Sequence, residues 1–102
     1  MFIGKVTGTV VATQKVPKVI GKKLLLVVAM NVTKDGGALE STGRVAVAVD
    51  TVGAGEGELV LVTQGSSARL TDMTADVPTD AVVIGIIDEI QAGGKELYQK
   101  QT

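Results

Sequence analysis

The feature that most constrains this sequence is a set of short runs whose apolar residues would occupy both faces of a β-strand. They are "KLLLVVAMNV" with its apolar stretch at 24–32, "RVAVAVD" at 44–50, "ELVLVT" at 58–63 and "AVVIGIIDEI" at 81–90. A strand that is apolar on both faces must be covered on both, yet a small barrel covers only its inward face. We therefore expect a barrel whose outer wall is covered by other copies of the chain.

The first segment predicts a strand by strict alternation. Residues 2–13 place Phe2 and Val6 on one face and mostly polar side chains, such as Lys5, on the other. This period of two over twelve residues is typical of a β-strand. Gly4 and Gly8 fall on the apolar face, which indicates strong bending or the close approach of another backbone.

The remaining segments complete a mainly β chain with a single domain over residues 1–102. Residues 33–43 read as an exposed loop, and Ser66 or Ser67 can cap a short helix that reaches about Asp72. Gly93-Gly94 predicts a turn into a tail strand. The predicted fold is a small five-stranded, OB-like, mostly antiparallel barrel with one short helix between the fourth and fifth strands.

Charge and aromatic content argue against nucleic acid and membranes as partners. The formal net charge is −1, and Phe2 and Tyr98 are the two aromatic residues. Binding of single-stranded nucleic acid needs a basic groove and stacking aromatics. No apolar run approaches the roughly 20 residues of a membrane-spanning helix, and charges and glycines interrupt the first ten residues before a signal sequence could form. The expected location is the cytoplasm.

Glycines at alternate positions mark the stretch "VGAGEGELVLVTQGSSARL" at 52–70. A dinucleotide fingerprint counted from Gly53 would need its third glycine at Glu58, and a helix would have to follow instead of a strand. The chain also contains no Gly-Lys-Ser/Thr phosphate loop. The glycines are better explained by positive φ angles, or by identical loops that crowd around an axis. No cofactor is expected here.

No group of residues predicts catalysis. The chain has no histidine and no cysteine, so a Ser-His-Asp triad at Ser66 or Ser67 is impossible and no His or Cys can hold a metal ion. A Ser-Lys pair is conceivable, but no lysine lies in a matching motif. Asp80 and Asp88 would lie ~20 Å apart along an extended strand, too far for two carboxylates to act together. Arg69 is expected to pair with a carboxylate, such as that of Asp80 or of a neighbouring subunit. The sequence predicts a protein that is not an enzyme.

Four of these stretches together resemble a known family, the pentameric vertex proteins of bacterial microcompartments found in carboxysomes and ethanolamine-type metabolosomes. They are "KVTGTVVAT" (5–13), "KLLLV" (23–27), "AVDTVGAGEGELVLVTQGSSAR" (48–69) and "PTDAVVIGIID" (78–88). The resemblance covers nearly the whole chain. Leu59 departs from the tryptophan that the family often carries, and the ending "DEIQAGGKELYQK" is more similar to the metabolosome branch.

The resemblance implies a cyclic homopentamer that caps the five-fold corners of a protein shell whose flat faces are hexameric tiles. It places the chain in the shell of a microcompartment, with hexameric shell proteins as partners and no catalytic role. It also implies structural residues at the pentamer interface or pore loop: Asp50, Gly53, Ala54, Gly55, Gly65, Ser66, Ser67, Arg69 and Asp80. Residues 53–55 would shape a backbone near the ring axis, and residues 65–69 would seat the helix against the ring.

An alternative function belongs to a different class. An oligomeric β-barrel could bind a small molecule or nucleotide with the glycine-rich stretch and the lysine-rich loop. The lysines are Lys15, Lys18, Lys22 and Lys23. A run of charges of this kind is also typical of a solvated loop with no ligand.

Overall fold

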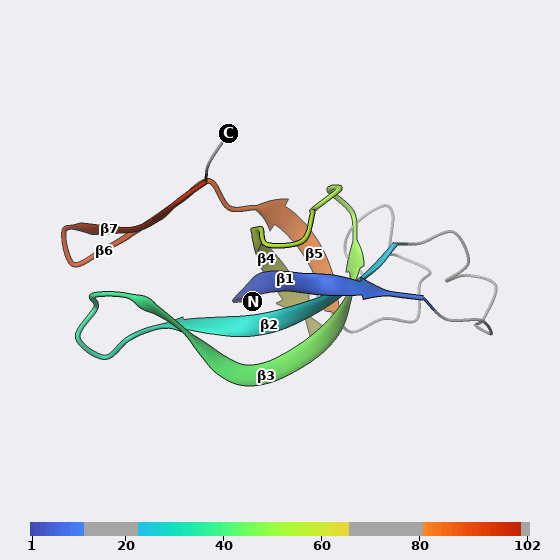
Figure 1. Ribbon diagram of the computed structural model, residues 1–102, viewed down its shortest axis with the longest axis horizontal. Helices are drawn as coiled ribbons and strands as arrows, with labels where there is room; N and C mark the ends of the chain where they lie inside the picture. Colours follow the sequence, from blue (N-terminus) through green and yellow to red (C-terminus); the bar gives the residue numbers. More distant parts are fainter. Residues whose placement is uncertain (12–22, 66–80, 101–102) are drawn as a thin grey trace.

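Five strands close into a barrel, and a two-stranded hairpin projects away from it (Figure 1). The computed structural model describes residues 1–11, 23–65 and 81–100. The barrel strands are β1 (Phe2–Val10), β2 (Leu24–Val32), β3 (Leu39–Asp50), β4 (Leu59–Gln64) and β5 (Ala81–Ile86). The hairpin consists of β6 (Glu89–Ala92) and β7 (Lys95–Gln99). The predicted five-stranded barrel and tail strand are confirmed.

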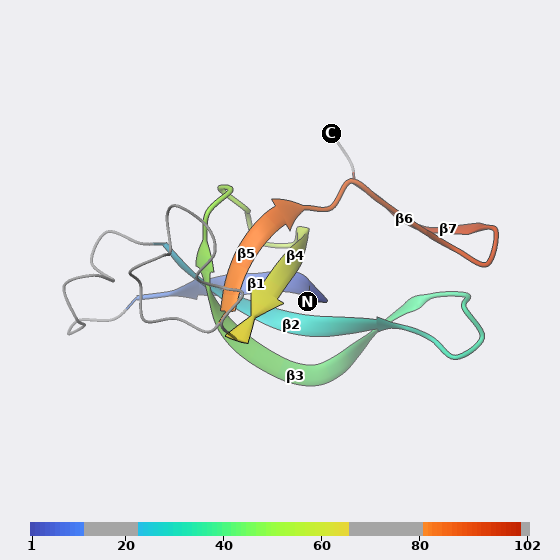
Figure 2. The same cartoon turned by 180° about the vertical axis from the view of Figure 1, so that it is seen from behind.

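The strand order around the barrel is β1-β2-β3-β5-β4, and β4 pairs back onto β1. Each pair is antiparallel except β3 and β5, which run parallel where Val49 lies opposite Val82 and Asp50 opposite Val83. The prediction of a mostly antiparallel barrel is therefore correct. β3 pairs with β5 through its last two residues, Val49 and Asp50. The first half of β3 diverges from β4 and β5, as the view from behind shows (Figure 2).

The barrel core follows the alternation of the sequence. Leu25 and Val27 of β2 are fully buried, whereas Leu26 and Val28, which alternate with them, face outward and are only half-buried. The residues that form the main core cluster are Val6, Leu25, Val27, Ala48, Ala54, Val60, Val62, Ala81 and Val83. On the outer wall, Val45 and Val47 are 56% and 47% exposed. The strands are thus apolar on both faces, as predicted, while one face lacks a cover within the described chain.

The third strand starts earlier than predicted. Residues 39–43 were expected to belong to an exposed loop, but β3 begins at Leu39 and pairs with the end of β2, where Glu40 lies opposite Asn31. The two strands continue beyond the barrel as a ribbon that is mostly exposed. No part of the described chain buries either face of the ribbon, so its residues are mostly polar. Polar residues together with Gly43 are typical of a loop, which explains the sequence-based prediction.

The last predicted strand is in fact two strands. Residues 81–90 were expected to form one strand, but β5 ends at Ile86 and β6 starts at Glu89 in a separate sheet. The backbone N–H of Ile87 still donates to the carbonyl of Leu59 at 2.9 Å. Beyond it the chain leaves the barrel at Asp88, where the apolar run of the sequence ends.

The predicted helix at residues 66–72 lies outside the described residues. The same holds for the side chains of Lys15, Lys18 and Lys22. Within the ranges that the structure describes, no helix is long and apolar enough to cross a membrane.

The two glycines of β1 play different parts in the packing. A Cβ atom added to Gly4 would lie 3.3 Å from Cγ2 of Val62 and 3.4 Å from Cβ of Val27, so two strands meet over this glycine. Gly8 has no atom of the described chain within 4 Å of such a Cβ, and it follows an irregularity in the β1–β2 register. The sequence suggested the close approach of another backbone, but the atoms close to Gly4 belong to side chains, and nothing in the described chain is close to Gly8.

We predict that Gly4→Val lowers the free energy of unfolding by about 1–3 kcal/mol, because it overpacks the core between β2 and β4. Gly8→Ala is the matched control and should change this free energy by less than about 0.5 kcal/mol. Chemical denaturation followed by circular dichroism measures both. Equal losses of unfolding free energy for the two variants would show that the contacts of Gly4 with Val62 and Val27 do not restrict the size of this residue.

Candidate functional site

Most of the predicted site residues that the structure describes lie in one segment, residues 50–58, which we call the glycine loop. It connects the end of β3 to the start of β4 and carries Asp50, Gly53, Ala54 and Gly55. In Figure 1 it is the yellow-green loop at the upper edge of the barrel. The structure therefore brings these four residues together.

Asp50 fixes the first turn of the glycine loop. It is the last residue of β3, and its side chain is 1% exposed. Its Oδ1 atom accepts hydrogen bonds from the backbone N–H groups of Val52, at 3.0 Å, and Gly53, at 3.1 Å. An aspartate that binds backbone groups two and three residues ahead is a common way to stabilise a turn.

Lys23 holds the same loop from the start of β2. Its Nζ atom donates to the carbonyl oxygen of Ala54 at 2.9 Å and lies 3.7 Å from Oδ2 of Asp50. This Oδ2 atom is buried without a hydrogen bond in the described structure, so the lysine supplies the nearby positive charge that a buried carboxylate needs. Lys23 thus acts as a structural residue of the loop.

Ala54 anchors the loop in the barrel. Its side chain is fully buried and belongs to the main core cluster. Two groups of Ala54 therefore hold the loop: its methyl group packs in the core, and its carbonyl oxygen accepts a hydrogen bond from Lys23. The methyl group of Ala54 thus points into its own barrel. The position of residues 53–55 relative to a ring axis stays a prediction.

Two of the three alternate glycines have positive φ angles. Gly53 has φ +78° and Gly57 has φ +90°, a region that side chains disfavour. Gly55 does not share this conformation; its N–H donates to Oε1 of Glu58 at 2.5 Å. The sequence-based explanation by positive φ is confirmed for the outer two glycines and is wrong for Gly55.

Glu58 links the glycine loop to the far end of the chain. Its Oε2 atom lies 2.9 Å from Nζ of Lys100. The hydrogen bond from Lys100, and next the one from the N–H of Gly55, lower the pKa of the Glu58 carboxyl. The same pairing raises the pKa of Lys100. The backbone N–H of Lys100 also donates to the carbonyl of Asp88 at 2.7 Å, which closes the base of the β6–β7 hairpin.

The other predicted site residues are not brought into this cluster by the described structure. Gly65 follows β4 with φ +66°, which explains a glycine at that position. Ser66, Ser67, Arg69 and Asp80 lie outside the described residues, so their roles stay predictions.

Sequence reasoning missed three residues that hold the loop: Lys23, Glu58 and Lys100. Lys23 was counted among the charges of a solvated loop, although its place directly before a buried strand could have indicated an inward role. Glu58 is three residues after Gly55, a spacing at which a carboxylate can reach back to a backbone N–H. Lys100 is 42 positions from Glu58, and no local pattern indicates that pair.

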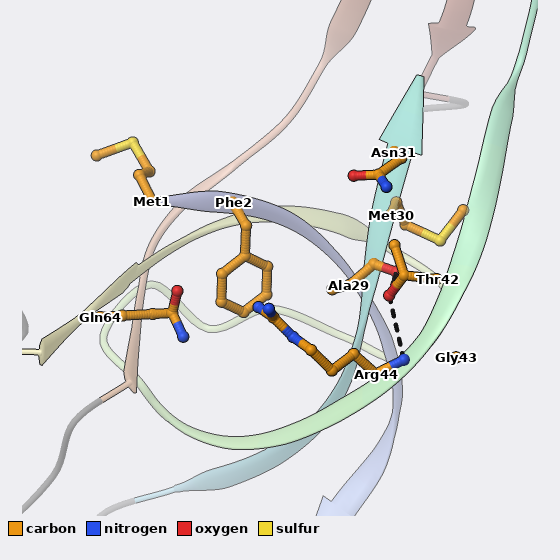
Figure 3. A pocket seen from close by; sticks show the side chains of 9 residues that line it. All are labelled: Met1, Phe2, Ala29, Met30, Asn31, Thr42, Gly43, Arg44 and Gln64. Carbon is orange, nitrogen blue, oxygen red and sulfur yellow. Dashed lines mark hydrogen bonds between the residues drawn. The ribbon is translucent and has the colours of Figure 1, made fainter. Parts of the chain in front are cut away.

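A separate pocket of about 630 Å³ opens where β3 diverges from β4 (Figure 3). The Arg44 guanidinium lies 5.6 Å from the centre of the Phe2 ring, and Gln64 approaches from β4. The Thr42 hydroxyl donates to the carbonyl of Ala29 and accepts from the N–H of Arg44. Neither the glycine loop nor Lys23 is among its lining residues. Of the residues on which the small-molecule alternative relied, those that the structure describes therefore do not line this pocket.

Comparison with known proteins decides the family. The family model described as "Ethanolamine utilisation protein EutN/carboxysome" matches residues 1–88. The chain belongs to the EutN/CcmL family. It is 48% identical to the carboxysome shell vertex protein CcmL of Synechocystis sp., over 99% of this chain and 96% of the relative. It is 50% identical to the bacterial microcompartment shell vertex protein PduN of Salmonella typhimurium, over 88% and 98%.

Solved structures of EutN/CcmL proteins have the same fold. The structure of Gloeobacter violaceus CcmL superposes with a TM-score of 0.86 at 43% identity, and the match covers 98% of both chains. GrpN of Rhodospirillum rubrum, described as a pentameric microcompartment shell protein, gives 0.72 at 45% identity over 89% of this chain and 96% of its own. Relatives from carboxysomes and from other microcompartments are both similar, so assignment to the metabolosome branch stays a prediction.

The anchoring of the glycine loop can be tested at Asp50 and at two glycines. Asp50→Ala removes a buried charged acceptor from two N–H groups and should cost about 3 kcal/mol of unfolding free energy. Gly53→Ala should cost about 1–2 kcal/mol because its φ is positive, whereas Gly55→Ala should cost less than about 0.5 kcal/mol. Urea denaturation of the three variants gives the order, and a larger loss at Gly55 than at Gly53 would contradict the loop geometry.

The Glu58–Lys100 pair predicts a dependence of stability on pH. Because the pKa of Glu58 is lowered in the folded chain, its contribution is present above the ordinary value of 4.5 and is lost as the pH falls through the folded pKa. Lys100 behaves oppositely: its raised pKa gives a contribution that is lost only as the pH rises above 10.5.

The variant Glu58→Gln isolates this effect. Thermal unfolding of the wild type and the variant should differ most near neutral pH, and the difference should shrink as the pH falls below about 4. A difference that stays constant over this range would show that the ion pair does not stabilise the fold.

Proposed function

We propose that this chain forms the pentameric vertices of a bacterial microcompartment shell. The observation that carries the proposal is similarity of 40–50% identity, over most of each chain, to proteins named as shell vertex proteins in carboxysomes and other microcompartments. One such relative, GrpN, is described as pentameric. The expected location is the shell itself, within the cytoplasm.

The physical reason for assembly is the outer wall of the barrel. Val45 and Val47 are large apolar side chains in the middle of a strand, and half of their surface faces solvent. In a cyclic ring each subunit presents two different surfaces to its two neighbours. Ring closure covers such residues without a second core, which suits a chain of only 102 residues.

The work of a vertex is geometric. A sheet of hexameric tiles is flat and closes into a shell only where five-fold units replace six-fold ones. We infer that hexameric shell proteins are the partners of the ring and that the chain performs no catalysis. The glycine loop suits this role because Asp50, Lys23 and Ala54 fix its backbone in one conformation, and a corner needs a reproducible shape.

Co-expression with hexameric shell proteins tests the proposal. Electron microscopy should show closed polyhedra when the chain is present and tubes or open sheets when it is absent. The specific activity of any encapsulated enzyme in dilute lysate should stay the same, since the compartment no longer matters there. Closed polyhedra of normal size without any vertex protein would contradict the vertex role.

The small-molecule alternative makes a different prediction. A nucleotide or another small ligand should raise the melting temperature of the isolated ring in a concentration-dependent way. A specific turnover that disappears from dilute lysate on deletion would likewise favour a binding or catalytic role over a structural one.

A further inference from the structure

The β6–β7 hairpin, residues 89–99, stands clear of the barrel in both views (Figures 1 and 2). We call it the arm. Its two strands contact each other extensively and make almost no contact with the barrel strands. A single two-stranded hairpin is at best marginally stable in water. The arm is nevertheless a regular hairpin with half-buried Ile90, Leu97 and Tyr98, so its apolar side needs a cover outside its own barrel.

Within the part of the chain that the structure describes, the polar contacts that attach the arm lie at its base. The Glu58–Lys100 ion pair and the hydrogen bond from the N–H of Lys100 to Asp88 fix where it leaves the barrel. Beside this base lies an apolar groove of about 580 Å³. Its apolar lining comes from the barrel and from the arm: Ile3, Leu61, Ile86, Ile87 and Ile90. Asp88, Glu89 and Gln91 complete the lining, and Ile90, which lies opposite Tyr98, connects the groove to the arm.

A second apolar surface lies on the outer side of β2 and β3. It consists of two cross-strand pairs, Leu26 opposite Val47 and Val28 opposite Val45, and we call it the valine face. The outer side of β1 lies between the two surfaces: its exposed Lys5 is opposite Val28 and Leu59, and its Ile3, which lines the groove, is opposite Met30. The chain therefore offers two distinct apolar surfaces, which is what a closed ring of identical subunits requires.

We propose that the arm and groove of one subunit bind the valine face of the next subunit in the ring. This inference rests on the proposed pentamer and adds which surfaces meet. The occupant is a second copy because the chain itself carries a second exposed apolar surface, and a relative described as pentameric supports assembly into a ring. The family model ends at residue 88, before the first residue of the arm.

Cross-linking tests the contact directly, because the natural chain has no cysteine. The double variant Val45→Cys with Ala92→Cys places one thiol on the valine face and one on the arm. The matched control combines Ala92→Cys with Val11→Cys, since Val11 is 90% exposed and lies at the other end of the barrel strands. A short bismaleimide reagent should join subunits of the double variant into covalent chains of up to five copies. The control should stay mainly uncross-linked.

The full-length variant Tyr98→Ser adds a second readout. The concentration at which the ring dissociates should rise by about tenfold, which corresponds to about 1.4 kcal/mol. Gln99→Ser, which changes the exposed neighbour on the same strand, should leave it unchanged. Native mass spectrometry at a series of dilutions measures both.

The outcomes separate this inference from the proposed function. If no ring forms for the wild type, the proposed pentamer fails first. If rings form but the double variant cross-links no more than the control, the arm does not bind the valine face. If Tyr98→Ser leaves the ring intact but prevents its binding to hexameric shell proteins, the arm binds a tile instead, and the inference is overturned.

Discussion

The outer wall of the barrel is the constraint on which the rest of this structure depends. Alternation along β2 places Leu25 and Val27 in the core, and the residues that alternate with them, Leu26 and Val28, are equally apolar. Burial of both faces would stabilise the fold by the ordinary hydrophobic effect, but one barrel has only one interior. The outer face therefore requires neighbours, and membership in a family with pentameric members gives those neighbours a cyclic arrangement.

The glycine loop illustrates how a small barrel sets a precise surface without a ligand or a catalytic group. Asp50 binds two backbone N–H groups, Lys23 binds a carbonyl, and Ala54 places its methyl group in the core. These contacts fix a backbone whose exposed residues include Gly53 and Gly57. Through Glu58 and Lys100 the same loop is joined to the arm, so the two features that we assign to assembly share one support.

The sequence predicts the barrel strands well and the elements outside the barrel poorly, for a physical reason. Strand β2 was predicted with its observed bounds, because the apolar run of the sequence at 24–32 coincides with the strand. The start of β3 at Leu39 and the break after Ile86 were missed, since ribbon and arm lack that burial. In the glycine loop, the family resemblance predicted Asp50 and Ala54 as structural residues. Their partner Lys23, and Lys100, which pairs with Glu58, are far from the loop in the sequence, so local patterns do not reveal these contacts.

The most direct test of the vertex account is the number of subunits in the natural assembly. Native mass spectrometry of the purified chain, at concentrations from nanomolar to micromolar, counts the copies without any partner protein. The account predicts a single closed species of five copies that persists on dilution. A species of six copies would make the chain a tile rather than a corner, and a stable folded monomer would contradict the claim that the outer wall requires neighbours.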